Sequence, residues 1–189
     1  MKIRNVEPVY KPNKIKIFEE YYYNMPKIKY AIFCDLDGVL CDFNGRFEEL
    51  IGSTPNDYER EHGTEKFIEA IQEHGTEFWA KMKWLAGGKE LWNYIKRYAP
   101  VILSRPFKND EDCIRGKIEW IYINLGKSVS FAMERNKEKY ANSDSILIDD
   151  DAENIHKFKE AGGMTILYKN CDDAIKQLSA MISDRGYSF

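Results

Sequence analysis

Four short apolar segments, each bounded by a turn signal or an acidic residue, constrain the fold more than any other feature of the sequence. Such segments are typical of strands in a parallel sheet, which are buried on both faces. Segments with apolar residues at helical spacing lie between them, which favours a sheet covered by helices on both faces. The apolar segments are 30–34, 101–103, 146–148 and 165–168, and the helical segments are 89–98, 112–125, 152–161 and 172–182.

A long helix-like stretch interrupts this alternation directly after the first apolar segment. Residues 44–86 carry aromatic and aliphatic side chains at helical spacing. We interpret the stretch as a small helical cap inserted into an α/β, Rossmann-like core formed by residues 29–43 and 87–189. Residues 1–28, rich in lysine and tyrosine, stand apart as a basic N-terminal arm. Because such sheets bind ligands beyond the carboxyl ends of their strands, we expect the chemistry there.

The composition indicates one globular domain with a small insertion. Of 189 residues, 43% are hydrophobic and 31% are charged, and the net charge is −3, which argues against a general nucleic-acid coat. No apolar run reaches the roughly 18 residues of a membrane span, and we recognise no secretory signal. The cysteines form no C-x-x-C pair, so we expect reduced thiols, no zinc site and a cytoplasmic protein.

The strongest chemical signal is the run Asp35-Leu36-Asp37-Gly38 at the end of the first apolar segment. Alternate residues of a strand point the same way, so the two carboxylates can face one space, and the glycine permits a tight turn. One carboxylate can then attack a phosphorus atom while the other donates or accepts a proton. Taken alone, the motif also fits an acidic turn without chemistry.

Other strand ends strengthen the chemical interpretation. Asp149 and Asp150 follow the segment 146–148, Ser104 follows 101–103, and Lys117 lies in the first half of the next helical segment. Crowded carboxylates repel unless a cation lies among them, and Mg²⁺ prefers such oxygen ligands together with phosphate oxygens. Ser104 can donate to a phosphate oxygen, and Lys117 can neutralise charge. On its own, Lys117 also fits a solvated helix lysine.

The order and spacing of these motifs resemble those of haloacid-dehalogenase-type phosphatases and, within that superfamily, the 5′(3′)-deoxyribonucleotidases. The resemblance covers about residues 29–180 and implies a haloacid-dehalogenase-like fold. The set that carries it is Asp35-x-Asp37, Ser104, Lys117 and Asp149-Asp150.

The resemblance also implies roles for the acidic residues. Asp35 is the nucleophile that takes the phosphoryl group as an aspartyl-phosphate, and Asp37 is the general acid and base. A Mg²⁺ ion is bound by the Asp35 carboxylate, the Asp37 backbone carbonyl and the Asp150 carboxylate, with Asp149 in support.

Substrate binding follows from the same resemblance. Ser104 and Lys117 hold the phosphate, and three rings form a pocket for the nucleoside. The rings are those of Phe43, Phe78 and Trp79, and the alternative is that they only join cap to core.

Two residues depart from the family pattern. Asp151 stands where the nucleotidases usually carry an arginine, and Arg105 replaces a small polar residue. Arg105 can supply the missing positive charge from another strand. These changes leave the expected chemistry intact but leave the preferred nucleotide open.

We therefore expect a Mg²⁺-dependent phosphatase that hydrolyses a nucleoside monophosphate, a small-molecule partner, with a dimer as one possible assembly. One alternative is a phosphatase acting on the 3′ or 5′ ends of polynucleotides, which would use the basic arm. An alternative of another class is a degenerate member that binds a nucleotide or a partner without turnover, although the intact Asp35 and Asp37 argue against it.

Overall fold

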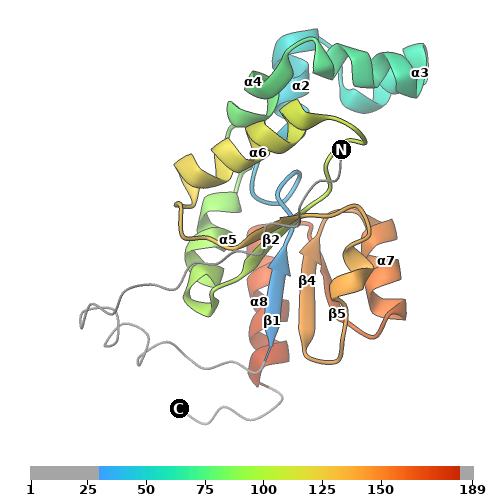
Figure 1. The fold of residues 1–189 in the computed structure, drawn as a ribbon. Coiled ribbons are helices and arrows are strands. Elements are labelled where there is room, and N and C mark those ends of the chain that lie inside the picture. Colours follow the sequence, from blue (N-terminus) through green and yellow to red (C-terminus); the bar gives the residue numbers. More distant parts are fainter. Residues whose placement is uncertain (1–29, 184–189) are drawn as a thin grey trace, which may run out of the picture.

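A five-stranded parallel sheet forms the centre of the computed structural model, which describes residues 30–183 (Figure 1). The strand order is β3-β2-β1-β4-β5, and every neighbouring pair is parallel. The α/β fold expected from the sequence is therefore confirmed. The strands are β1 (Ala31–Cys34), β2 (Val101–Ser104), β3 (Phe131–Met133), β4 (Ser145–Asp149) and β5 (Met164–Leu167).

Strand β3 is the one strand of this sheet that the sequence pattern does not predict. It is three residues long, Phe131, Ala132 and Met133, and each is only half-buried because the strand lies at the edge of the sheet. A fully buried strand reads as a longer apolar run, so a short edge strand gives little signal. The predicted arm, residues 1–28, lies outside the described residues.

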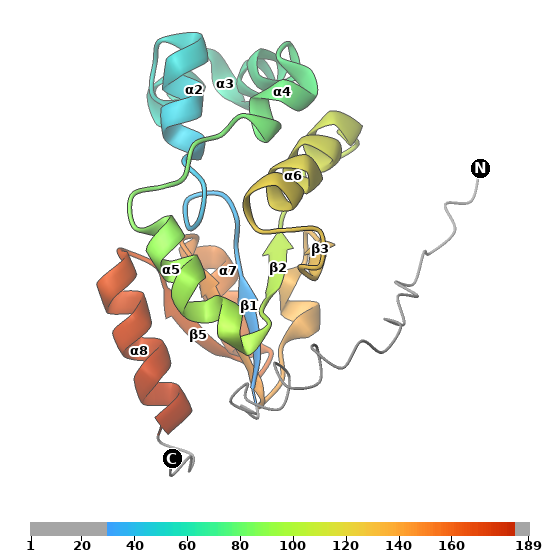
Figure 2. The same cartoon turned by 90° about the vertical axis from the view of Figure 1, so that its left-hand side faces the viewer.

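Helices cover both faces of the sheet (Figure 2). In β1, Ile32 and Cys34 belong to the main apolar core, which includes residues of α5 (Gly88–Ile95) and α8 (Cys171–Ser183). Phe33 points to the opposite face and packs with Phe158 of α7 (Ala152–Glu160). Alternate side chains of β1 thus pack into two separate apolar clusters, as expected for a strand that is buried on both faces.

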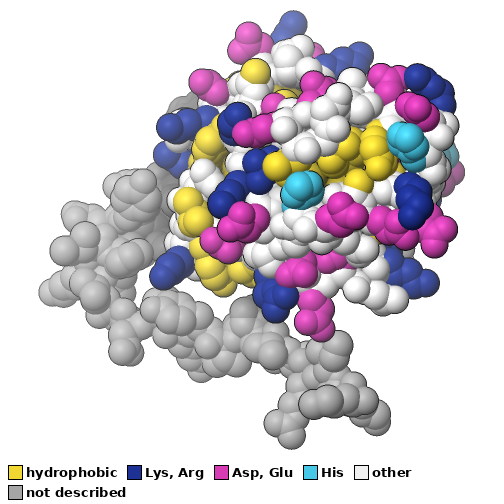
Figure 3. Space-filling model, turned by 90° about the horizontal axis from the view of Figure 1, so that it is seen from above, with side chains coloured by type: hydrophobic (Ala, Val, Ile, Leu, Met, Phe, Trp, Pro, Cys, Tyr) yellow, Lys and Arg dark blue, Asp and Glu magenta, His cyan; other side chains and the backbone are white. Residues whose placement is uncertain are grey.

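Three helices lie beyond the carboxyl ends of the strands, within the segment interpreted as a cap (Figures 1 and 2). They are α2 (Phe43–Ile51), α3 (Pro55–Gln72) and α4 (Gly75–Ala80), and α3 is interrupted at Gly63, where φ is 84°. Seen from this side, acidic and basic side chains are interspersed over the surface (Figure 3). Within residues 30–183, no helix is both long enough and apolar enough to cross a bilayer.

The two ends of this helical segment are tied together by backbone hydrogen bonds. The amide of Asp42 donates to the carbonyl of Lys83, and the amide of Leu85 donates to the carbonyl of Leu40, each at 2.9 Å. Asp42 also caps α2, accepting a bond from the amide of Gly45 at 2.8 Å. The chain therefore leaves and re-enters the core at one place, close to the end of β1.

Helix α6 (Glu111–Asn124) packs tightly against α4. At the contact, a Cβ atom on Gly116 would overlap the carbonyl oxygen of Thr76 and the Cβ of Trp79. The Thr76 hydroxyl donates to Asp112 at 2.6 Å near the start of α6. Two short 3₁₀ helices, η1 (Lys96–Tyr98) and η2 (Lys137–Tyr140), complete the described elements.

Gly116→Ala is expected to destabilise the protein by about 1–3 kcal/mol, the usual cost of overpacking a close contact. The loss should occur although alanine is favoured over glycine in a helix by about 1 kcal/mol. Urea unfolding measures the change, with the exposed Glu119→Ala on the same helix as a near-neutral control. A Gly116→Ala protein as stable as the parent would show that α4 and α6 are not in close contact.

Candidate active site

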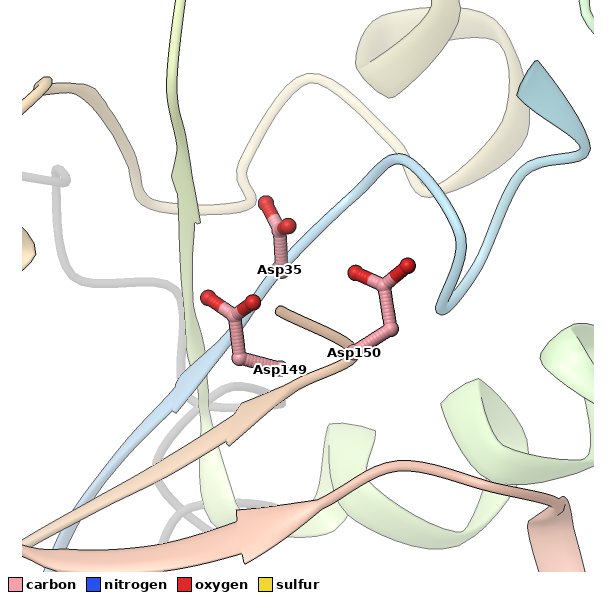
Figure 4. Close-up of side chains that lie close together, drawn as sticks. All are labelled: Asp35, Asp149 and Asp150. Carbon is pink, nitrogen blue, oxygen red and sulfur yellow. The ribbon is translucent and has the colours of Figure 1, made fainter. Parts of the chain in front are cut away.

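Three carboxylates meet where β1 and β4 end, and they point away from the strand ends (Figure 4). Oxygen atoms of Asp35, Asp149 and Asp150 all lie within 4.8 Å of one another. Asp35 directly follows β1, and its amide donates to the carbonyl of Ile148 in β4 at 2.9 Å. Asp35 and Asp149 are buried, whereas Asp150 is exposed. The convergence follows from two parallel neighbouring strands that end at the same edge of the sheet.

Gly38 allows the turn after Asp37 to lie against Asp150. Its φ of 73° is in the left-handed region that favours glycine, and a Cβ atom there would overlap the carboxylate of Asp150. The Gly38 amide closes the turn by donating to the carbonyl of Cys41 at 2.9 Å. The glycine is thus needed for backbone conformation and for the approach of an acidic side chain.

Lys137 is a central residue of the site that the sequence patterns do not predict. Its ammonium lies 2.8 Å from Asp35 Oδ1 and 2.7 Å from Asp149 Oδ2, and its side chain is 1% exposed. Burial alone would lower the pKa of Lys137, but these two carboxylates raise it above its ordinary value. Lys137 lies in η2 within the charged run 134–139, which reads as a solvated turn.

Asp149 is held by protein donors on both of its oxygens. Oδ2 accepts from Lys137, Oδ1 accepts from the amide of Asp151 at 2.9 Å, and the side chain of Asn154 lies 3.2–3.3 Å from the two oxygens. Since its bonding capacity is largely used, Asp149 is better suited to orient Lys137 than to offer a free ligand atom.

A second lysine, Lys117 of α6, lies at the carboxylate of Asp37. Its ammonium donates to Asp37 Oδ2 at 2.5 Å, to the hydroxyl of Ser104 at 3.0 Å and to the carbonyl of Arg105 at 2.7 Å. Burial alone would lower the pKa of Lys117, but the charge of Asp37 and neighbouring groups raises it. The structure therefore brings together Asp37 of the turn after β1, Ser104 of β2 and Lys117 of α6.

The acidic cluster favours occupation by a cation. Burial, opposed by Lys137 and assisted by Asp149 and then Asp37, raises the pKa of Asp35 to about 7. Partial burial of its carboxyl group, and then the charge of Asp149, raises the pKa of Asp150 to about 6. In addition, the buried Oδ1 of Asp35 has an ion pair but no well-aligned hydrogen bond. Crowded oxygen ligands with raised pKa values fit a Mg²⁺ ion.

The three rings expected to bind the nucleoside lie together but fill the space between them. The ring centre of Phe43 is 5.5 Å from that of Phe78 and 5.7 Å from that of Trp79. Phe78 and Trp79 are buried, and Phe43 is half-buried. At these distances the rings contact one another, so no base fits between them in this arrangement.

The two departures from the family pattern have distinct positions. Asp151 is the N-cap of α7, where its carboxylate accepts from the amide of Glu153 at 2.8 Å. Arg105 is exposed. It lies close enough to α7 to help lower the pKa of Glu153, after the larger contribution of Lys157.

Comparison with solved structures identifies the fold. A hydrolase from Streptococcus pneumoniae gives a TM-score of 0.51 at 20% identity, covering 80% of this chain and 100% of its own. A haloacid-dehalogenase (HAD) superfamily hydrolase from Ehrlichia chaffeensis gives 0.47 at 14% identity, covering 84% and 100%. A HAD-family enzyme from Bacteroides thetaiotaomicron, solved as a magnesium complex, gives 0.43 at 14% identity, covering 74% and 93%.

The chain has an α/β fold similar to that of the Streptococcus pneumoniae hydrolase. At these identities the likeness shows the fold alone, and only the first of the three reaches a TM-score of 0.5. No protein-family model matches the chain, and no curated protein matches it. The parallel α/β fold expected from the sequence is thus confirmed, whereas the superfamily, the nucleotidase subfamily and the substrate are not decided by these comparisons.

Asp150→Asn is expected to stabilise the metal-free protein at neutral pH. A pKa raised from 3.8 to about 6 means that the folded protein binds this proton more tightly than the unfolded chain. The carboxyl group therefore reduces stability as the pH rises through this window. We expect Asp150→Asn to raise the free energy of unfolding at neutral pH by about 1 kcal/mol, after allowance for solvent screening. Urea unfolding in EDTA, at neutral pH and near pH 4, measures the gain, which should vanish at the lower pH.

Magnesium provides the control for this variant. Since a ligand stabilises the state that binds it, Mg²⁺ should raise the melting temperature of the parent protein more than that of Asp150→Asn. Equal stabilisation of the two proteins would contradict a metal site at Asp150.

Proposed function

We propose that this protein is a Mg²⁺-dependent phosphomonoester hydrolase that works through an aspartyl-phosphate on Asp35. The observation that carries the proposal is that two carboxylates of one turn are each matched by a separate buried lysine. Asp35 lies against Lys137, and Asp37 lies against Lys117. Such an arrangement suits a nucleophile and a proton-transfer group acting on one phosphoryl group.

In the first step, an oxygen of Asp35 forms a bond to phosphorus and the ester P–O bond breaks. The departing oxygen takes its proton from the carboxyl group of Asp37, which leaves an alcohol and an acyl-phosphate on Asp35. In the second step, Asp37 takes a proton from a water molecule whose oxygen attacks phosphorus. The acyl-phosphate P–O bond breaks, releasing inorganic phosphate and restoring the Asp35 carboxylate.

The other residues bind and neutralise the phosphoryl group. The Ser104 hydroxyl would donate to a phosphate oxygen, and Lys137 would keep Asp35 aimed. Lys117 would bind phosphate once a substrate competes for its ammonium. The carboxylates of Asp35 and Asp150, with the Asp37 backbone carbonyl, would hold Mg²⁺, which supplies positive charge to the phosphate oxygens.

For the substrate, we propose a nucleoside monophosphate, with residues 44–86 as a cap over the phosphate site and the cytoplasm as the place of action. The half-buried ring of Phe43, one residue beyond the N-cap of α2, supports this choice. Because Phe78 and Trp79 pack against that ring, a base would lie against the part of Phe43 that remains exposed. On the face shown in Figure 3, the described residues mix both signs of charge, which does not favour a polynucleotide strand.

Asp35→Asn is expected to abolish phosphate release, because an amide cannot form the acyl-phosphate. Asp37→Asn should lower kcat by about 10²-fold or more, the scale of lost acid–base catalysis. Steady-state phosphate release measures both variants, and circular dichroism checks the fold. The mechanism fails if Asp35→Asn keeps substantial activity.

A phosphate-release screen with and without Mg²⁺ tests metal and substrate together. EDTA should stop turnover, Mg²⁺ should restore it, and Ca²⁺ should support little because it takes looser coordination. Mononucleotides should be hydrolysed faster than sugar phosphates and phosphorylated oligonucleotide ends. A preference for oligonucleotide ends would overturn the substrate, and activity that survives exhaustive chelation would remove the metal.

A further inference from the structure

The ammonium group of Lys117 has no proton left to donate. A lysine carries three N–H donors, and Lys117 directs them to Asp37, Ser104 and the carbonyl of Arg105. Its side chain is 1% exposed. With these bonds Lys117 holds the carboxylate of Asp37 in place and links it to Ser104 at the end of β2.

Trp79 covers the remaining side of this ammonium. The Nζ atom of Lys117 lies 4.8 Å from the centre of the Trp79 ring, a distance that gives a cation–π contact. Trp79 is itself 1% exposed, and Phe107 packs nearly perpendicular to it with ring centres 5.1 Å apart. Such contacts strengthen when water is excluded, as it is here.

The backbone places Trp79 where it is. Gly116, the residue before Lys117, lets α4 approach α6 so closely that a Cβ atom would overlap the Cβ of Trp79. The ring therefore reaches Lys117 from the neighbouring helix. A larger residue at position 116 would push the ring away from the ammonium.

The carboxylate of Asp37 is also contacted on its other oxygen. The thiol of Cys41 lies 3.5 Å from Asp37 Oδ1, while Lys117 holds Oδ2. Asp37 is thus fixed by two side chains, Cys41 of its own turn region and Lys117 of α6, and Lys117 is the charged one. Anything that loosens Lys117 would also loosen the aim of Asp37.

We propose that Trp79 is a positioning residue that acts through Lys117 to keep Asp37 aimed, rather than a ring that stacks on a base. The proposal rests on the proposed function, in which Asp37 transfers protons. A long lysine side chain is flexible, so without the Trp79 ring the Lys117 ammonium would become hydrated and would adopt other orientations. Misplacing a reacting group by about 1 Å can cost 10²-fold in rate.

Trp79→Leu is therefore expected to lower kcat by about 10-fold or more. The loss should be equal for a mononucleotide and a simple aryl phosphate, with KM changed less than about three-fold, and Trp79→Phe should recover most of it. If instead KM rises for the nucleotide alone, Trp79 binds the base and the proposal is overturned.

A double-mutant cycle with Lys117→Met distinguishes an effect of Trp79 that acts through Lys117 from a general loss of packing. If Trp79 acts through Lys117, Trp79→Leu should cost less than about two-fold in kcat once Lys117 is gone. Independent, multiplying losses would overturn the proposal. Phe47→Leu, which changes a buried ring of the same aromatic cluster, is the control and should lower stability without lowering kcat.

Chemical labelling tests whether Trp79 shields the Lys117 ammonium from solvent, and it needs no enzymatic activity. Reductive methylation followed by mass spectrometry should leave Lys117 unmodified in the parent and in Phe47→Leu, but should modify it at least several-fold faster in Trp79→Ala. Lys137, also buried, is the internal reference and should stay protected in all three. Continued protection of Lys117 in Trp79→Ala would overturn the proposal, even if the chain hydrolyses no phosphate ester. If Lys117 is modified faster in Trp79→Ala but the parent protein shows no turnover, only the proposed function is overturned.

Discussion

Two buried lysines permit a cluster of carboxylates to exist at the end of a hydrophobic sheet. Lys137 bridges Asp35 and Asp149, and Lys117 binds Asp37, so each of these three aspartates has a lysine partner, although one lysine is shared by two carboxylates. Removing one partner of a buried ion pair leaves an uncompensated charge, which commonly costs about 3–5 kcal/mol. Asp150 has no such lysine among its close contacts in the described part of the chain, and its raised pKa fits a place that a cation would stabilise.

The strand order determines where this chemistry can form. Asp35 follows β1 and Asp149 ends β4, and these two strands are neighbours at the point where the connections turn to the other half of the sheet. The helical segment starts and ends beside this point, and α6, which packs against α4, places Lys117 at Asp37. A single glycine, Gly116, sets the distance between α4 and α6, and thereby links the packing of the segment to the position of Lys117.

Much of the fold could be predicted because short apolar segments and helical spacing report burial directly, and four of the five strands gave that signal. The meeting of Asp35, Asp149 and Asp150 also followed, since parallel strands end at one edge. Lys137 could not be predicted, because it lies in a charged turn whose preceding strand, β3, has only three residues. The grouping of the rings was predictable, but their burial depends on how α4 meets α6, which no local pattern encodes.

Trapping the intermediate tests the account most directly. Asp37→Asn should still be phosphorylated by an activated aryl phosphate, whose leaving group needs no proton, but should hydrolyse the product slowly. Borohydride reduction would then convert the acyl-phosphate to homoserine, which peptide mass spectrometry locates. The account predicts homoserine at position 35 and none in the Asp35→Asn, Asp37→Asn double variant. Aryl phosphate consumed with Asp35 unmodified, or a modification at another residue, would contradict it.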